Sequence, residues 1–201
     1  MQSERSLIPT PMPVRRHARS GNRGLALTAL CLAVLLVVMD NTIVNVAIPT
    51  MSDALNASST DLQWVVDAYT LSFAALLLPA GKLSDRWGRR RMLLVGLAGF
   101  AVVSAATAFS WALWQLVTLR VVLGVCAALS SIIVIFEGSR YRSLAVGLWA
   151  ATSGVGIALG PIIGGVLLEH YAWNSIFWVC SVIGVVALAC IAVAVPEVRA
   201  Y

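Results

Sequence analysis

The chain has 201 residues, of which 60% are hydrophobic and only 11% are charged. An ordinary soluble domain carries about 25% charged residues, so this composition argues against a soluble globular protein and against a disordered chain. The formal net charge is +5. Nucleic acid binding would require the basic residues to cluster on a folded, soluble face. Because the composition argues against a soluble protein, we expect no nucleic acid partner.

Six apolar runs follow one another along the chain. A helix needs about 20 apolar residues to cross a hydrocarbon core about 30 Å thick. The runs lack the two-residue alternation of barrel strands, and backbone polar groups in lipid must be satisfied within the segment. We therefore expect an all-α membrane protein with six transmembrane helices, at approximately 25–48, 62–80, 92–110, 112–136, 143–168 and 175–195.

Basic residues indicate the orientation of these helices. All but one of the 14 Lys and Arg residues lie before the first run, between the second and third, between the fourth and fifth, or after the sixth. The positive-inside rule places these segments in the cytoplasm. We expect a disordered basic cytoplasmic tail at 1–23, a six-helix bundle at 24–196 and a cytoplasmic end at 197–201. The protein would then be a multi-pass protein of the plasma (inner) membrane, with both termini in the cytoplasm.

Three charged residues interrupt the apolar runs: Asp40 in the first, Asp67 in the second and Arg120 in the fourth. Charged groups within a membrane are costly and normally face a bundle interior. At about 1.5 Å per residue, all three lie roughly 8–12 Å below the outer surface. We predict that they share one polar site, where the surplus carboxylate binds a proton or pairs with a cation. The alternative is a static Asp–Arg pair that only joins two helices.

Polar residues around Asp40 are candidates for a substrate cavity. Asn41, Thr42 and Asn45 are predicted to line it, with bonding to neighbouring helices as the alternative. The four cysteines lie within apolar runs, which is typical of small buried hydrophobic residues. The sequence shows no nucleophile–base pair, no metal-ligand spacing and no phosphate loop, so we expect no enzyme, no metal and no cofactor.

Glycines in the fifth run have a regular spacing. Gly156, Gly160 and Gly164 recur every fourth residue, which places them on one helix face and permits close approach of a neighbouring helix. Pro161 removes a backbone hydrogen bond and is expected to bend the helix. This face is predicted to be a surface along which two helices rock.

Four segments, in register along the chain, resemble the motifs of a known family. The stretch between the second and third runs, with Gly81, Asp85, Arg86, Gly88, Arg89 and Arg90, resembles the signature loop of the major facilitator superfamily. Asp40-x-Thr-x-Val-Asn-Val-Ala-x-Pro49 resembles the first-helix motif of the 14-helix drug:proton antiporters. Leu116-x-x-x-Arg120-x-x-x-Gly124 resembles the proton-linked arginine motif. Gly156-x-x-x-Gly160-Pro161-x-x-Gly164-Gly165 resembles the antiporter motif.

The resemblance implies a fold and a mechanism. It implies one half of a major-facilitator-type bundle, built from 3+3 inverted repeats. It also implies that Asp40 and Arg120 couple to protons, that the signature loop latches the cytoplasmic side, and that the fifth helix seals the cavity against leak. The implied activity is multidrug efflux, in which a proton gradient drives the export of a small hydrophobic or cationic substrate across the lipid bilayer.

Length limits this interpretation, because family members have two six-helix halves with the substrate site between them. The chain corresponds to the N-terminal half. Transport would then need the missing C-terminal half or self-association. One alternative is a truncated half-transporter that does not transport, or that interacts with a full transporter. The other alternative is solute uptake in place of export.

Overall fold

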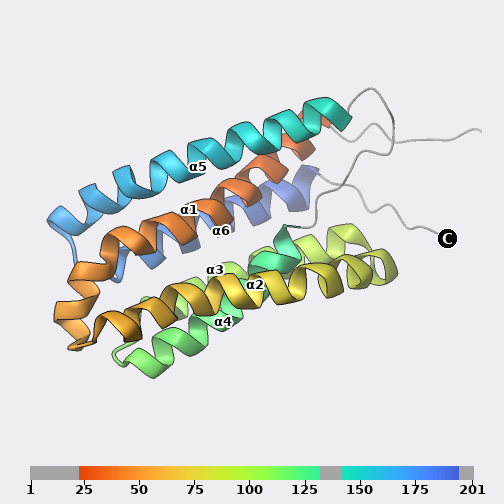
Figure 1. Ribbon diagram of the computed structural model, residues 1–201. Coiled ribbons are helices and arrows are strands. Elements are labelled where there is room, and N and C mark those ends of the chain that lie inside the picture. The colour runs from red at the N-terminus through yellow and green to blue at the C-terminus, as the bar shows by residue number, and fades with distance from the viewer. Residues whose placement is uncertain (1–22, 132–141, 195–201) are drawn as a thin grey trace, which may run out of the picture.

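The computed structural model describes residues 23–131 and 142–194 (Figure 1). Within these ranges the chain forms helices and no strand. The predicted tail at 1–23, apart from Arg23, the predicted end at 197–201 and the segment 132–141 lie outside the described residues. The helices are α1 (Arg23–Leu55), α2 (Ser59–Trp87), α3 (Arg89–Thr107), α4 (Leu113–Ser130), α5 (Arg142–His170) and α6 (Ser175–Ala194).

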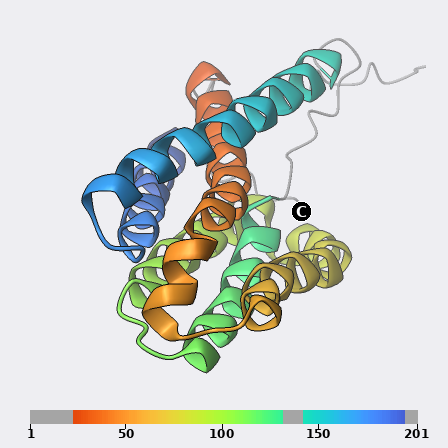
Figure 2. The same ribbon diagram turned by 60° about the vertical axis from the view of Figure 1, so that its left-hand side comes forward.

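All six helices are long and apolar enough to cross a membrane. They run lengthwise beside one another, and the connections α1–α2, α3–α4 and α5–α6 lie at one end of the bundle (Figures 1 and 2). The α2–α3 connection lies at the opposite end. The predicted all-α fold with six membrane-spanning helices is confirmed.

The helix contacts follow a two-fold pattern. α1 packs mainly against α5 and α6, α4 packs mainly against α2 and α3, and α3 packs against α6. Exchanging the first three helices with the last three maps α1–α5 onto α2–α4, maps α1–α6 onto α3–α4, and leaves α3–α6 unchanged. Because each group has three helices, the second group begins at the opposite end of the bundle. This is the arrangement that two inverted three-helix repeats produce.

Three helices, α1, α2 and α3, extend beyond the apolar runs that predict them. α1 continues past residue 48, with Pro49 inside it, to Leu55. α2 continues to Trp87 and α3 begins at Arg89, so the predicted inner loop at 81–91 is helical except at Gly88, whose φ is +93°. Hydropathy marks the part of a helix that suits lipid, whereas the helix itself ends where the backbone turns.

The N-terminus of α2 shows how the chain turns at the other end of the bundle. Ser58 Oγ accepts a hydrogen bond from the Asp61 amide, and Asp61 Oδ2 accepts one from the Ser58 amide. This capping box satisfies backbone donors that would otherwise be left without partners at the helix start.

The core lies where α1, α3, α4 and α6 meet, and α2 and α5 are the most exposed helices. Large fully buried side chains include Tyr69, Phe100, Phe177 and, as the largest, Arg120. A charged side chain in that position distinguishes this interior from an ordinary apolar core, and it defines the site described next.

Candidate functional site

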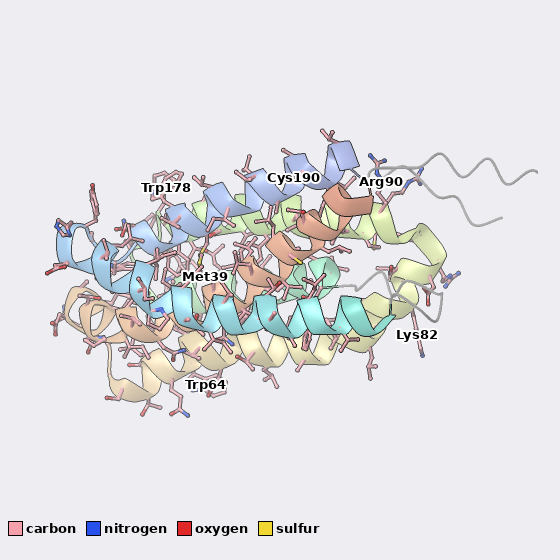
Figure 3. The ribbon with its side chains drawn as sticks, turned by 90° about the horizontal axis from the view of Figure 1, so that it is seen from above. Met39, Trp64, Lys82, Arg90, Trp178 and Cys190 are labelled. Atoms are coloured by element: carbon pink, nitrogen blue, oxygen red, sulfur yellow. The ribbon has the colours of Figure 1, made fainter. Side chains whose placement is uncertain are left out.

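An ion pair joins α1 and α4 in the bundle interior. Arg120 Nη1 lies 2.6 Å from Asp40 Oδ2, and neither residue is exposed. The two helices are equivalent in the two repeats, so the pair connects the first helix of one repeat to the first helix of the other. Figure 3 shows Met39, the chain neighbour of Asp40, well inside the bundle. The structure therefore brings together two of the three charged residues that the sequence predicts to meet.

Helix α2 holds the other side of the Arg120 guanidinium. Arg120 Nε donates to the Val65 carbonyl at 3.2 Å, and the guanidinium carbon lies 4.2 Å from the centre of the Tyr69 ring. A cation over an aromatic face is attracted by the negative charge density of the ring. The Tyr69 hydroxyl donates to the Val37 carbonyl of α1 at 3.1 Å. The guanidinium of α4 is thus contacted by α1 on one side and by α2 on the other.

The ion pair is incompletely satisfied. Asp40 Oδ1 and Arg120 Nη2 are buried and have no hydrogen-bond partner among the described residues. The Cys180 thiol of α6 lies beside the Asp40 carboxyl group. A carboxylate has a neutral, protonated form, whereas a guanidinium stays charged in proteins. The net charge of the Asp40–Arg120 pair can therefore change only at Asp40.

Asp67 lies outside this pair. It is exposed on α2, two residues before the buried Tyr69. Two residues correspond to a rotation of about 200° around a helix, so Asp67 and Tyr69 point in nearly opposite directions. Depth along a helix can be counted from the sequence, but the face cannot be assigned in the same way, and the structure does not bring Asp67 to Arg120.

The polar residues after Asp40 have different surroundings. The Thr42 hydroxyl lies within hydrogen-bonding distance of the Val38, Met39 and Gly156 carbonyls, the last at 3.4 Å across the contact with α5. Asn45 is exposed, and its Nδ2 donates to the carbonyl of the partly buried Asn41 at 2.9 Å. Thr42 therefore takes part in a helix–helix contact, and Asn45 lies on the outer surface of the bundle.

Three of the predicted glycines form the contact between α5 and α1. A Cβ on Gly156 would lie 3.1 Å from Val38, one on Gly160 would overlap Thr42 Oγ1, and one on Gly164 would lie 2.9 Å from Ile43. Pro161 and Gly165 are exposed, and a Cβ on Gly165 would meet nothing within 4 Å. The four-residue spacing therefore brings two backbones close together, with Pro161 and Gly165 outside the contact.

Comparison with known proteins identifies the family of this bundle. Residues 30–201 match the family model of the Major Facilitator Superfamily. The chain belongs to this superfamily. The structure of a bacterial homolog of the human lysosomal transporter Spinster, inward-facing and occupied, matches 87% of the chain and 44% of its own length with a TM-score of 0.75. Its sequence identity is 19%, so this likeness concerns the fold.

Several curated relatives are named as efflux or resistance proteins. The chain is 46% identical over 176 residues to the multidrug efflux pump LfrA of Mycolicibacterium smegmatis, covering 85% of the chain and 34% of the pump. It is 38% identical over 199 residues to the tetracenomycin C resistance and export protein of Streptomyces glaucescens, covering 94% and 37%. It is 39% identical over 179 residues to the methyl viologen resistance protein SmvA of Salmonella typhimurium, covering 86% and 36%. The chain thus spans about a third of the length of these relatives.

The superfamily signature segment lies where α2 meets α3. Gly81, Asp85 and Arg86 belong to the last turns of α2, Gly88 forms the junction, and Arg89 and Arg90 open α3. Arg90 Nη2 donates to the Ala192 carbonyl near the end of α6 at 3.0 Å. Figure 3 shows Lys82 and Arg90 at the same end of the bundle. One arginine of this segment therefore connects the two repeats of this superfamily member.

The sequence analysis did not identify three uncharged residues that surround the ion pair. Val65, Tyr69 and Cys180 contact Arg120 or Asp40 and carry no charge that would mark them in an apolar run. A signal for two of them was available. Val65 and Tyr69 are four residues apart, on one face of α2, and a tyrosine hydroxyl within a membrane span needs a polar partner.

Proposed function

We propose that this chain is the N-terminal half of a proton-coupled exporter of small hydrophobic or cationic drugs and antibiotics, which works by alternating access. The observation that carries the proposal is the buried ion pair between Asp40 and Arg120, which joins the two repeats in the bundle interior. Ionisable residues inside membrane bundles mark ion and proton pathways.

Names of relatives support the substrate class. One relative is a multidrug efflux pump, another confers tetracenomycin C resistance and export, and a third confers methyl viologen resistance. These names give two specific compounds, tetracenomycin C and the organic cation methyl viologen. We assign the same broad class to the exporter that contains this chain, and we assign it to the plasma (inner) membrane with both termini in the cytoplasm.

The proposed coupling step is proton binding at Asp40. Protonation neutralises the carboxylate and removes the charge partner of Arg120, which weakens the contact between α1 and α4. Loss of the proton restores the pair. Because the pair connects the two repeats, its charge state biases their relative position. The signature segment at Asp85 and Arg86 would latch the cytoplasmic side in one of the two positions.

The proposal requires a second half. The outward faces of α2 and α5 carry exposed apolar side chains, including Leu78 and Ile162. A C-terminal half, or a second copy of the chain, would complete the substrate cavity next to the first half. Asp67 and Asn45, both exposed, would then be candidates to line that cavity.

The test is pH-gradient-driven export of methyl viologen from proteoliposomes. The chain is reconstituted alone, and also as a chimera in which it replaces the matching segment of the LfrA pump. Asp40→Asn should abolish gradient-driven export by the competent form. Asp53→Asn, an exposed aspartate on the same helix, is the matched control and should leave export unchanged. Export that persists in Asp40→Asn, or that ignores the pH gradient in both forms, would show that the mechanism is wrong.

A further inference from the structure

Among the described residues, Arg120 makes one salt bridge, to Asp40, and its charge–charge attraction is lost when Asp40 is neutral. Two further contacts of Arg120 come from one face of α2. Nε donates to the Val65 carbonyl, and the guanidinium plane lies over the Tyr69 ring, four residues further along the same helix. Neither contact depends on the charge of Asp40. A group that holds Arg120 in both charge states of the site is therefore present on α2.

Tyr69 is itself buried and is held by two contacts of its own. It is 2% exposed, its hydroxyl donates to the Val37 carbonyl of α1, and its ring stacks on Phe73 with 6.4 Å between ring centres. Val37 lies three residues before Asp40, on the same side of α1. Tyr69 thus contacts both α1, the helix that carries Asp40, and the guanidinium of Arg120.

A glycine on α4 makes this placement possible. A Cβ on Gly124 would lie 2.5 Å from the Tyr69 carbonyl and would overlap the Ser72 hydroxyl. Gly124 lies one turn after Arg120, so α4 approaches α2 closely within one turn of the guanidinium. The close approach of the two backbones therefore lies at Tyr69 itself, whose ring is 4.2 Å from the guanidinium carbon.

We propose that Tyr69 is the positioning residue for Arg120, holding the guanidinium toward α1 whether Asp40 is charged or neutral. This inference rests on the proposed function, because it deepens the role of the same ion pair. The ring supplies the attraction to the cation, and the hydroxyl fixes the ring to α1 beside Asp40. Without the ring, Arg120 would be less constrained and would stabilise the charged form of Asp40 less.

The experiment follows protonation of Asp40 in the chain itself. Infrared difference spectra of the reconstituted protein are recorded as a function of pH, and the carbonyl band of a protonated carboxyl group is assigned by its loss in Asp40→Asn. Tyr69→Leu removes the ring and should move the midpoint of this band upward by about one pH unit. Tyr69→Phe keeps the ring and should retain most of the wild-type midpoint.

Phe73→Leu is the matched control, because it removes a neighbouring aromatic ring that does not contact Arg120 by any described interaction. It should move the midpoint much less than Tyr69→Leu does, because it leaves the Tyr69 ring over Arg120 and the bond from the Tyr69 hydroxyl to Val37 in place. Circular dichroism and gel filtration establish that each variant is folded. An unchanged midpoint in Tyr69→Leu, or an equal shift in Phe73→Leu, overturns the inference.

A second measurement works even if Asp40 does not titrate in the accessible range. Denaturation of Tyr69→Leu is compared in the wild-type background and in Arg120→Met. The loss of stability should be markedly smaller when Arg120 is absent, and equal losses in both backgrounds overturn the inference. Neither measurement involves transport, so failure here leaves the export proposal standing. Export that is independent of Asp40 would instead refute the proposed function while leaving the contact between Tyr69 and Arg120 intact.

Discussion

At the scale of single residues, the bundle interior holds an ion pair, Asp40 and Arg120, whose two members respond differently when the other is removed. Asp40 and Arg120 are both fully buried and lie 2.6 Å apart. Isolated buried charges are very costly, and a group that can neutralise itself does so. Asp40 can bind a proton if Arg120 is removed, whereas Arg120 keeps its charge if Asp40 is removed. Removing Asp40 and removing Arg120 should therefore lower the free energy of unfolding by different amounts.

This asymmetry predicts a stability series. Asp40→Leu should lower the free energy of unfolding by about 3–5 kcal/mol, because it leaves the Arg120 charge buried without a partner. Arg120→Met should cost less, and the double variant should be more stable than Asp40→Leu alone. The measurement is denaturation in mixed micelles followed by circular dichroism. Costs that simply add in the double variant would contradict an energetically coupled pair.

At the scale of helices, two equivalent helix–helix contacts are built in the same way, with a glycine packed against a hydroxyl-bearing residue. Gly160 of α5 lies against Thr42 of α1, and Gly124 of α4 lies against Ser72 of α2. In each case a glycine faces a hydroxyl group, and two backbones approach closely. The contacts α1–α5 and α2–α4 correspond to each other in the two repeats. The small residues therefore lie where one repeat packs against the other.

Alanine at these glycines should separate the helices. Gly160→Ala should lower the free energy of unfolding by about 1–3 kcal/mol, the usual cost of overpacking. Gly124→Ala should cost more, because the obstacle includes the Tyr69 carbonyl of the α2 backbone. Gly165→Ala is the control, since its Cβ meets open space and alanine favours the helix.

These effects are measured by thermal denaturation in detergent. Thr42→Ala removes the hydroxyl that meets the new methyl group and should recover part of the loss in Gly160→Ala. Equal stabilities of Gly160→Ala and Gly165→Ala would show that the close approach has no energetic consequence.

Helix positions could be predicted from the sequence because length and apolar composition are local properties. The α5 glycine face could also be predicted, since a four-residue spacing needs no knowledge of the partner helix. The face on which a side chain points is set by packing between helices distant in sequence. Asp67 and Thr42 illustrate this limit: one lies on the exposed face of α2, and the other contacts α5. Tyr69 could be recognised from the sequence as a hydroxyl that needs a polar partner, but its contact with Arg120 follows only once α2 is placed beside α4.

At the scale of the whole molecule, the two ends of the bundle differ in charge. The junction of α2 and α3 carries Lys82, Arg86, Arg89, Arg90 and Arg91, whereas the connections at the other end contain no Lys or Arg. These connections are 56–58, 108–112 and 171–174. The difference is what the positive-inside rule reads, because basic segments are retained on the cytoplasmic side.

This charge difference predicts which end faces the cell exterior. In a background where the four cysteines are replaced by serine, a cysteine at Asn56 should react with a membrane-impermeant maleimide in intact cells. A cysteine at Lys82 should react only after the membrane is permeabilised. Both positions are exposed, so burial does not account for a difference. Ala33→Cys, buried within α1, should stay unlabelled in both conditions and serves as the control. The reverse pattern, with Lys82→Cys labelled from outside, would mean that the orientation is inverted.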